Sequence, residues 1–309
     1  MADRYWILGT GTWDSTSTTN WSATSGGTGG ASVPTASDNV FFDVNSNVGT
    51  GAFTVTMANS PRVCNDFTAS GLDGVMTLAG SGIGLTVSGS LTFQATNFTR
   101  TYTGVTTFNA TTTGKTVTTN GVTFGQSVTF SGVGGGWTLG SAISLGSQAL
   151  TISNGTFDTS SSGNYAVTCG SFTSSFGTRT INLNASTVSA SGTDFNLGTG
   201  TGLTFNAGTS QITLSSAGPT FSGNSKTFYN VSFTSTGMLF FSMAGTNTFN
   251  NLTISGQTTV GLAQYPFSAD QTINGTFTVS AGTASAYRIS VYANTFHTPR
   301  TLTCGCIFN

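Results

Sequence analysis

The side chains that could do chemistry in this sequence are aspartates, because the nine acidic residues include no glutamate. Two pairs lie close together in the chain, Asp38 with Asp43 and Asp66 with Asp73. Two carboxylates about 5 to 10 Å apart could cleave a glycosidic bond. Both pairs, however, lie near Gly, Asn or Ser, where an aspartate commonly accepts a hydrogen bond from its own turn. We therefore interpret them as turn residues and predict that the protein is not an enzyme.

Histidine and cysteine predict neither a metal site nor a nucleophilic triad. His297 is the single histidine, and its neighbours indicate an exposed turn. Cys64 and Cys169 are interpreted as small buried hydrophobic residues. Cys304 and Cys306 form a Cys-Gly-Cys motif that could chelate or oxidise, but no second Cys/His cluster accompanies it. We predict no catalytic residue, no metal ligand and no cofactor.

The low charge of the chain argues against two classes of partner. Only 6% of residues are charged, against about a quarter in a typical domain, and the formal net charge is −1. Such a surface has no basic stripe for a phosphate backbone. The glycine run at residues 26–30 has no Lys-Ser/Thr behind it and is no phosphate loop. No run approaches the roughly 18 apolar residues of a membrane helix, so we predict neither nucleic-acid nor membrane binding.

A repeat between residues 228 and 280 indicates which secondary structure the chain forms. Three copies of one pattern occur, in which an apolar residue and an asparagine-bearing corner precede apolar residues that alternate with Thr or Ser. The copies are Phe228-Tyr-Asn-Val-Ser-Phe233, Phe249-Asn-Asn-Leu-Thr-Ile254 and Ile273-Asn-Gly-Thr-Phe-Thr-Val279. A unit of about 20 to 25 residues cannot bury its own apolar face, so copies must stack on one another.

The sequence therefore predicts an all-β fold, a single-stranded right-handed β-helix or β-solenoid. Apolar residues alternate with Thr elsewhere too, as in Phe53-Thr-Val-Thr-Met57, and the phrase Thr-Phe recurs at residues 107–108 and 129–130. Stacked coils would place equivalent residues about 4.8 Å apart, so Phe would stack on Phe and Thr would bond Thr. A β-sandwich built from repeats is the alternative. Residues 46–309 are predicted to form the solenoid.

Residues 1–45 differ in composition from the rest and are predicted to form an N-terminal cap or docking segment. The first coil of a solenoid exposes its core and its strand edges, and an aromatic segment can cover them. The candidate residues for capping or docking are Trp6, Trp13, Trp21, Phe41 and Phe42.

The two ends of the chain lead to expectations about export and assembly. Met1-Ala-Asp-Arg opens no signal peptide, so we expect synthesis and folding in the cytoplasm. A strand-like Thr301-Leu-Thr-Cys304 lies close to the last residue, and we expect this end of the solenoid to be covered by a partner, by another copy or by further chain. Other copies of the chain, in a homotrimer, are the expected partner.

Several phrases of the sequence resemble those of the repetitive Thr/Asn/Gly-rich β-solenoid proteins of tailed-phage virions, and related phrases occur in secreted bacterial surface proteins. The phrases are Arg4-Tyr-Trp6, Gly9-Thr-Gly-Thr-Trp13, Asp38-Asn-Val-Phe-Phe-Asp43, Thr248-Phe-Asn-Asn-Leu-Thr-Ile254, Gln271-Thr-Ile-Asn-Gly-Thr-Phe277 and Thr298-Pro-Arg-Thr-Leu302. The resemblance spans most of the chain and implies a structural or surface protein, with no catalytic motif to carry over.

From the residues and the resemblance together we expect a phage virion structural protein that acts as a rigid, non-enzymatic projection. It would be a head decoration, a head fibre or a tail-fibre component, located in the virion after assembly in the host cytoplasm. Its partners would be other copies of itself, capsid or tail proteins, and host surface glycans. The alternatives are a fragment of a bacterial cell-surface adhesin and, less favoured, a tailspike-like glycan depolymerase.

Overall fold

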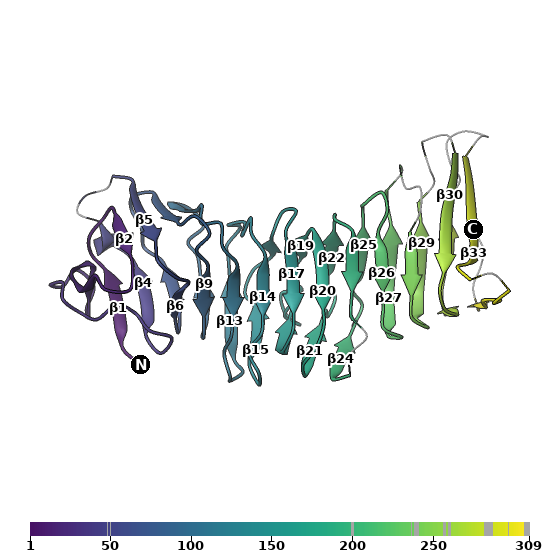
Figure 1. Ribbon diagram of the computed structural model, residues 1–309, viewed down its shortest axis with the longest axis horizontal. Coiled ribbons are helices and arrows are strands. Elements are labelled where there is room, and N and C mark those ends of the chain that lie inside the picture. Colours follow the sequence, from purple (N-terminus) through teal and green to yellow (C-terminus); the bar gives the residue numbers. More distant parts are fainter. Residues whose placement is uncertain are drawn as a thin grey trace. The chain divides into compact units, whose positions relative to one another are not determined.

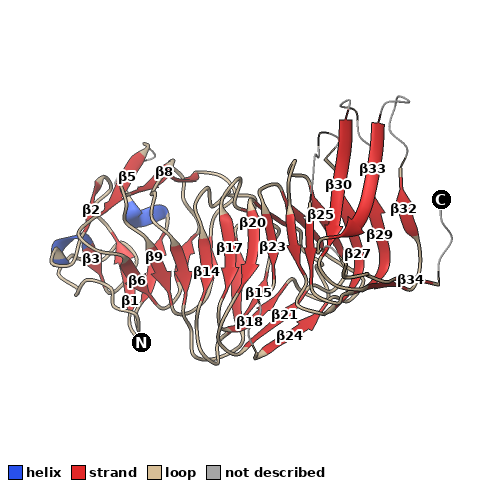
Figure 2. Cartoon of the chain, turned by 45° about the vertical axis from the view of Figure 1, so that its right-hand side comes forward, coloured by secondary structure: helices blue, strands red, loops and turns tan. Residues whose placement is uncertain are grey.

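The chain folds into short strands joined by tight turns. The computed structural model describes residues 1–309 except 48, 50, 199–200, 236, 238–240, 256–257, 259–260, 281–286, 296 and 306–309. Within the described residues there are strands and two 3-10 helices but no α-helix (Figure 2). The helices are η1 (Thr18–Asn20) and η2 (Val44–Ser46). No helix among the described residues has the length and apolar character that a membrane span requires.

The strands stack in parallel, which confirms the predicted β-solenoid. Among the strand pairs that the structure describes, the pair that contains Trp6 and Trp21 is antiparallel and the others are parallel. Neighbours in each sheet are separated by about one coil of sequence; Thr107, for example, pairs with Thr129 and Phe108 with Phe130. The β-sandwich alternative is wrong, because sandwich sheets are built from antiparallel strands.

The chain divides into two compact units. The first consists of Met1–Leu145 and Ser153–Phe157, and the second of Gly146–Ile152 and Asp158–Asn309. The predicted boundary at residue 45, between a cap and a solenoid, stays a prediction.

In the first unit three stacks of strands surround the interior (Figure 1). One stack contains β3 (Trp21–Ser22), β1 (Asp3–Trp6), β4 (Asn39–Phe42), β7 (Phe67–Ala69), β10 (Leu91–Thr92), β13 (Lys115–Thr118) and β15 (Gly136–Leu139). A second contains β2 (Gly11–Trp13), β5 (Phe53–Met57), β8 (Met76–Ala79) and β11 (Phe98–Arg100). The third contains β6 (Arg62–Cys64), β9 (Leu85–Val87), β12 (Thr106–Phe108) and β14 (Val128–Phe130). Strand β16 (Ile143–Ser144) also belongs to this unit, and β18 (Gly155–Asp158) contributes residues to both units.

The second unit repeats this construction. One stack contains β17 (Ala149–Ile152), β20 (Ser171–Ser174), β23 (Asp194–Asn196), β26 (Thr220–Ser222), β28 (Ser242–Ala244), β30 (Gly261–Phe267) and β33 (Tyr287–Ala293). Another contains β19 (Val167–Cys169), β22 (Thr187–Ala190), β25 (Gln211–Leu214), β27 (Thr227–Phe233), β29 (Thr248–Ile254), β31 (Gln271–Ile273) and β34 (Leu302–Cys304), with β32 (Phe277–Val279) also paired to β29. Strands β21 (Arg179–Asn182) and β24 (Leu203–Asn206) form a third pair.

The core of each unit consists of the apolar residues of the alternating pattern, stacked coil on coil. In the first unit the rings of Phe108 and Phe130 lie 4.7 Å apart and nearly parallel. In the second, Phe195 lies between Phe172 and Phe221 at 5.1 and 5.3 Å. All five side chains are fully buried. Threonines outside the core also stack, since the hydroxyls of Thr151 and Thr173 are 2.9 Å apart. Strand alternation therefore sorts Phe inward and Thr outward.

The repeat found in the sequence is a repeat of the structure. Phe228 pairs with Phe249, and Asn230 pairs with Asn251, whose side-chain Nδ2 donates to Asn230 Oδ1 at 2.8 Å. Tyr229 and Asn230 both lie outside the core between buried Phe228 and Val231. Two successive outward residues break the alternation at this point, and the asparagine occupies the corner that the pattern predicts.

Candidate functional site

The aromatic residues of the first two coils form a buried cluster. Trp6, Trp13, Trp21 and Phe42 have no exposed area. The ring of Trp21 lies 5.2 Å from that of Trp6, 5.3 Å from that of Trp13 and 6.2 Å from that of Phe42. Side chains without exposed area cannot contact a docking partner unless the fold opens.

Phe41 differs from the other four aromatic candidates because it faces outward. It is half-buried and stacks on Tyr5 of the neighbouring strand, with ring centroids 4.7 Å apart. Of the five candidate residues, Phe41 is thus the one with surface available to a partner. Whether the segment docks, caps or does both stays a prediction.

The two aspartate pairs of the sequence flank strands β4 and β7. Asp38 directly precedes β4 and Asp43 directly follows it. Asp38 and Asp43 thus lie at opposite ends of one strand. Asp66 precedes β7, and Asp73 is exposed in the turn after that strand.

Asp38 and Asp43 accept hydrogen bonds from their own turns, as the sequence interpretation predicted, whereas Asp66 accepts one from the next coil. Asp38 accepts bonds from the backbone N and the hydroxyl of Thr35 at 3.0 and 2.7 Å. Asp43 accepts one from Asn45 N at 2.9 Å, and Asp66 accepts one from Ser90 N at 2.7 Å. These bonds close turns and join adjacent coils.

The electrostatics of Asp38 are those of a stabilised anion. Burial alone would raise its pKa, but the two bonds from Thr35, the charge of Arg4 and the bond from Ala2 N together hold the pKa below its ordinary value. A general acid of glycoside hydrolysis needs the opposite shift, because it must stay protonated near neutral pH.

Asp158, to which the sequence analysis assigned no role, bonds to asparagines of the next coil. Its two oxygens accept bonds at 2.9 Å from the Nδ2 atoms of Asn182 and Asn184, and its Oδ1 also accepts one from Ser160 N at 2.7 Å. Asn206 Nδ2 continues the row by donating to Asn182 Oδ1 at 2.8 Å. Stacked amides and one carboxylate thus join successive coils of the second unit.

The cysteines and the histidine lie where the sequence analysis expected, as far as the structure describes them. Cys64 and Cys169 are buried free thiols, and His297 is exposed in a turn with φ of 59°. Cys304 is disulfide-bonded, and Cys306 lies outside the described residues. In the part of the chain that the structure describes, no three His, Cys, Asp or Glu side chains gather as metal ligands.

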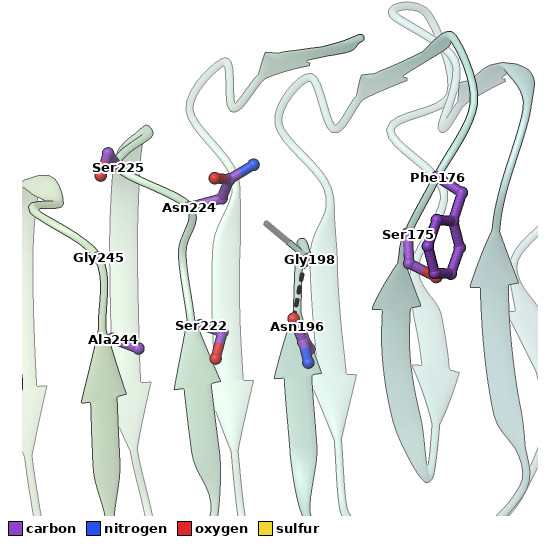
Figure 3. A pocket seen from close by; sticks show the side chains of 9 residues that line it. All are labelled: Ser175, Phe176, Asn196, Gly198, Ser222, Asn224, Ser225, Ala244 and Gly245. Atoms are coloured by element: carbon purple, nitrogen blue, oxygen red, sulfur yellow. Dashed lines mark hydrogen bonds between the residues drawn. The ribbon is translucent and has the colours of Figure 1, made fainter. Parts of the chain in front are cut away.

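A groove of about 510 Å³ lies in the second unit, at the carboxyl ends of four adjacent strands (Figure 3). The strands are β20, β23, β26 and β28. Their inward residues Phe172, Phe195, Phe221 and Met243 are fully buried. The groove is lined by the residues at and just beyond the strand ends, which are Ser175, Phe176, Asn196, Gly198, Ser222, Asn224, Ser225, Ala244 and Gly245.

Each of the four coils leaves its strand through a residue with left-handed backbone. In three coils these residues are Gly198 with φ of 69°, Asn224 and Ser225 with φ of 53° and 55°, and Gly245 with φ of 87°. Glycine and asparagine accept this conformation readily. In the remaining coil the residue is Phe176, with φ of 65°, and its side chain is 80% exposed. Phe176 is therefore unusual both in its backbone and in its exposure.

A buried arginine fixes the turn that carries Phe176. Arg179 is 1% exposed, and its Nη1 donates to the carbonyl oxygens of Phe176 and Gly177 at 2.6 and 3.0 Å. Its Nε donates to Ser174 Oγ at 2.5 Å, and its Nη2 donates to Leu197 O, on the next coil, at 3.1 Å. One guanidinium thus bonds to both ends of the turn and to the adjacent coil.

Sequence reasoning missed this groove. Its lining residues are spread from 175 to 245 and belong to the Ser, Asn and Gly background of the chain. The one signal that could have found it is Ser-Ser-Phe176-Gly-Thr-Arg179, a large apolar residue inside a turn-type composition.

Comparison with known proteins assigns no family to the chain, since no family model, no curated protein and no solved structure matches it.

Proposed function

We propose that this chain is a structural component of a tailed-phage virion and acts as a rigid, non-enzymatic projection. It would serve as a head decoration, a head fibre or a tail-fibre element. The observation that carries the proposal is the stack of parallel coils, in which Phe ladders fill the interior and Thr, Ser and Asn rows face outward. Fixed contacts between successive coils make such a stack stiff, and its surface is polar with few charges.

The positions of the carboxylates support the non-enzymatic part of the proposal. Asp38, Asp43 and Asp66 accept bonds from backbone amides of turns or of the next coil, and Asp158 is held by two asparagines. These bonds give the aspartates a stabilising role that needs no substrate. The depolymerase alternative would require release of reducing sugars from a capsular polysaccharide and its loss in an Asp→Asn variant.

Purified virions provide the direct test. Virions would be banded by density from a lysate in which the chain is produced, and its copies per particle counted by mass spectrometry against the major capsid protein. We expect a fixed integer ratio, with antibody labelling confined to the head or to the tail in electron micrographs. Recovery of the chain only in envelopes of uninfected cells would instead favour the adhesin alternative.

The oligomeric state tests the assembly part of the proposal. We propose a homotrimer that contacts capsid or tail proteins, because a closed ring of three copies suits a spike or a decoration. Size-exclusion chromatography with light scattering should give three times the 31.5 kDa mass of the chain. A monomer at every concentration would contradict this part.

A further inference from the structure

We infer that the groove at the ends of β20, β23, β26 and β28 binds a neutral oligosaccharide, with the ring of Phe176 as the stacking platform for one sugar. This is a binding function beyond that of a projection, and it does not depend on whether the chain belongs to a virion. Residues from four coils contribute, so the site exists only in the folded stack.

The first step of the argument concerns the cost of placing Phe176 where it is. A large apolar side chain that is 80% exposed gains little from burial. Its left-handed backbone is unfavourable for a bulky residue such as phenylalanine, by about 1 to 2 kcal/mol. Folding of this chain therefore gives no reason for phenylalanine here, since glycine would remove the strain and lose almost no packing. An exposed, strained residue of this kind points to a ligand.

The second step concerns preorganisation. Arg179 bonds to the carbonyls of Phe176 and Gly177 and to Ser174 on the other side of the turn, so the ring is carried by a fixed loop. Gly198 on the adjacent coil permits the close approach, because a Cβ atom there would lie 2.5 Å from Ser174 O. A platform held before the ligand arrives avoids part of the entropy cost of binding.

The third step concerns the chemistry of the groove. None of the nine described residues that line it is charged, and their side chains offer hydroxyl and amide groups. The Oδ1 atom of Asn196 accepts a bond from Gly198 N at 2.7 Å, which fixes the plane of its amide (Figure 3). Lys226, which follows the lining residue Ser225 in the sequence, is not part of the lining, and its Nζ donates to Leu203 O at 3.1 Å. Hydroxyls and amides are both donors and acceptors, as a polyhydroxylated ligand requires.

The fourth step concerns the repeat along the groove. Consecutive coils lie about 4.8 Å apart, close to the length of one pyranose residue in an extended chain. Ser175, Asn196 and Ser222 follow one another on three neighbouring coils, and Asn224 lies on the same coil as Ser222. Successive sugars can therefore meet successive polar groups, while the apolar face of one ring lies on Phe176.

An aromatic platform beside neutral polar groups suits a sugar better than a peptide, whose backbone would need an unpaired strand edge.

The test is binding of defined hexasaccharides to the intact chain by isothermal titration calorimetry. The neutral probes are maltohexaose, isomaltohexaose, cellohexaose and chitohexaose, and a hexamer of galacturonic acid is the anionic comparison. We expect at least one neutral hexamer to bind. Phe176→Gly should lower its affinity about tenfold, as expected for one lost aromatic contact. Asn224→Gly, which keeps the left-handed backbone, should lower the affinity by a smaller factor.

Two controls separate binding from folding. Tyr229 is a 36% exposed aromatic residue of β27, outside the groove, and Tyr229→Ala should leave the affinity unchanged. The midpoint of denaturant unfolding should not fall in Phe176→Gly, so a loss of binding there cannot come from unfolding. Binding of the anionic hexamer alone, an affinity that Phe176→Gly leaves unchanged, or no binding by any neutral probe would each overturn the inference.

Discussion

Arg179 and Phe176 are joined by a bond of 2.6 Å from the guanidinium Nη1 to the backbone carbonyl oxygen. The donor is buried and the phenyl ring that it helps to position is exposed. A buried cation thus stabilises a surface feature through the main chain. Arg179 donates to carbonyl and hydroxyl oxygens, and burial of its guanidinium lowers its pKa.

Replacing Arg179 with methionine should destabilise the second unit. Methionine has a similar length but no donors, so the carbonyls of Phe176, Gly177 and Leu197 would lose their partner. We expect the free energy of unfolding to fall by about 2 to 4 kcal/mol. Urea denaturation measures the fall, and limited proteolysis should show earlier cleavage near residue 176.

The matched control for that change is Arg4→Met. Arg4 also donates to a serine carbonyl and hydroxyl, at Ser32, but these bonds are exposed. We expect a loss below about 0.5 kcal/mol. Equal effects of the two substitutions would show that burial of Arg179 does not determine its contribution.

Phenylalanines of the core and of the groove should respond in opposite ways to truncation. Phe195 is fully buried between Phe172 and Phe221, so Phe195→Ala should cost about 3 to 5 kcal/mol of unfolding free energy. Phe176→Gly should cost nothing or stabilise by up to about 1 kcal/mol, because backbone strain is relieved. Denaturant midpoints of the two variants provide the comparison. A large loss in Phe176→Gly would show that the ring packs in solution.

Acid should remove the contribution of Asp38 to the stability of the fold. The folded pKa of this carboxyl lies below its unfolded value, which is about 3.9. Its stabilisation is therefore fully present above the unfolded pKa and is lost as pH falls through the folded pKa. We expect the melting temperature of the wild type to fall below about pH 4 more steeply than that of Asp38→Asn. Parallel curves for the two proteins would contradict this assignment.

The buried thiols should be unreactive until the protein unfolds. Burial, with a smaller effect from Asp66, raises the pKa of Cys64 far above its ordinary value, and burial raises that of Cys169 to about 12. Since the thiolate is the reactive form, both should resist alkylation by iodoacetamide at pH 8. Peptide mapping should find these two cysteines modified only after denaturation. Rapid labelling of either one in the folded protein would show that its coil opens locally.

Much of the fold could be predicted because alternation is a local property of the sequence. The pairing of Phe228 with Phe249 and of Asn230 with Asn251 follows the repeat residue by residue. The next coil shows where this reasoning ends. Ile273 pairs with Phe249 but Phe277 pairs with Leu252, so one extra residue is accommodated near Gly275. Sequence patterns do not show where a coil accommodates such an insertion.

The sequence by itself determined that the chain forms stacked short strands with Phe inside and Thr, Ser and Asn outside, because side chains of a strand alternate between two faces. It also indicated that Asp38 and Asp43 accept bonds from backbone amides of their own turns. Only the tertiary structure decided that three tryptophans are wholly buried, that Phe176 is exposed, and that Ser175, Asn196 and Asn224 line one groove. The physical reason is register: residues of different coils become neighbours through pairing between strands, and coils of unequal length hide that pairing from the sequence.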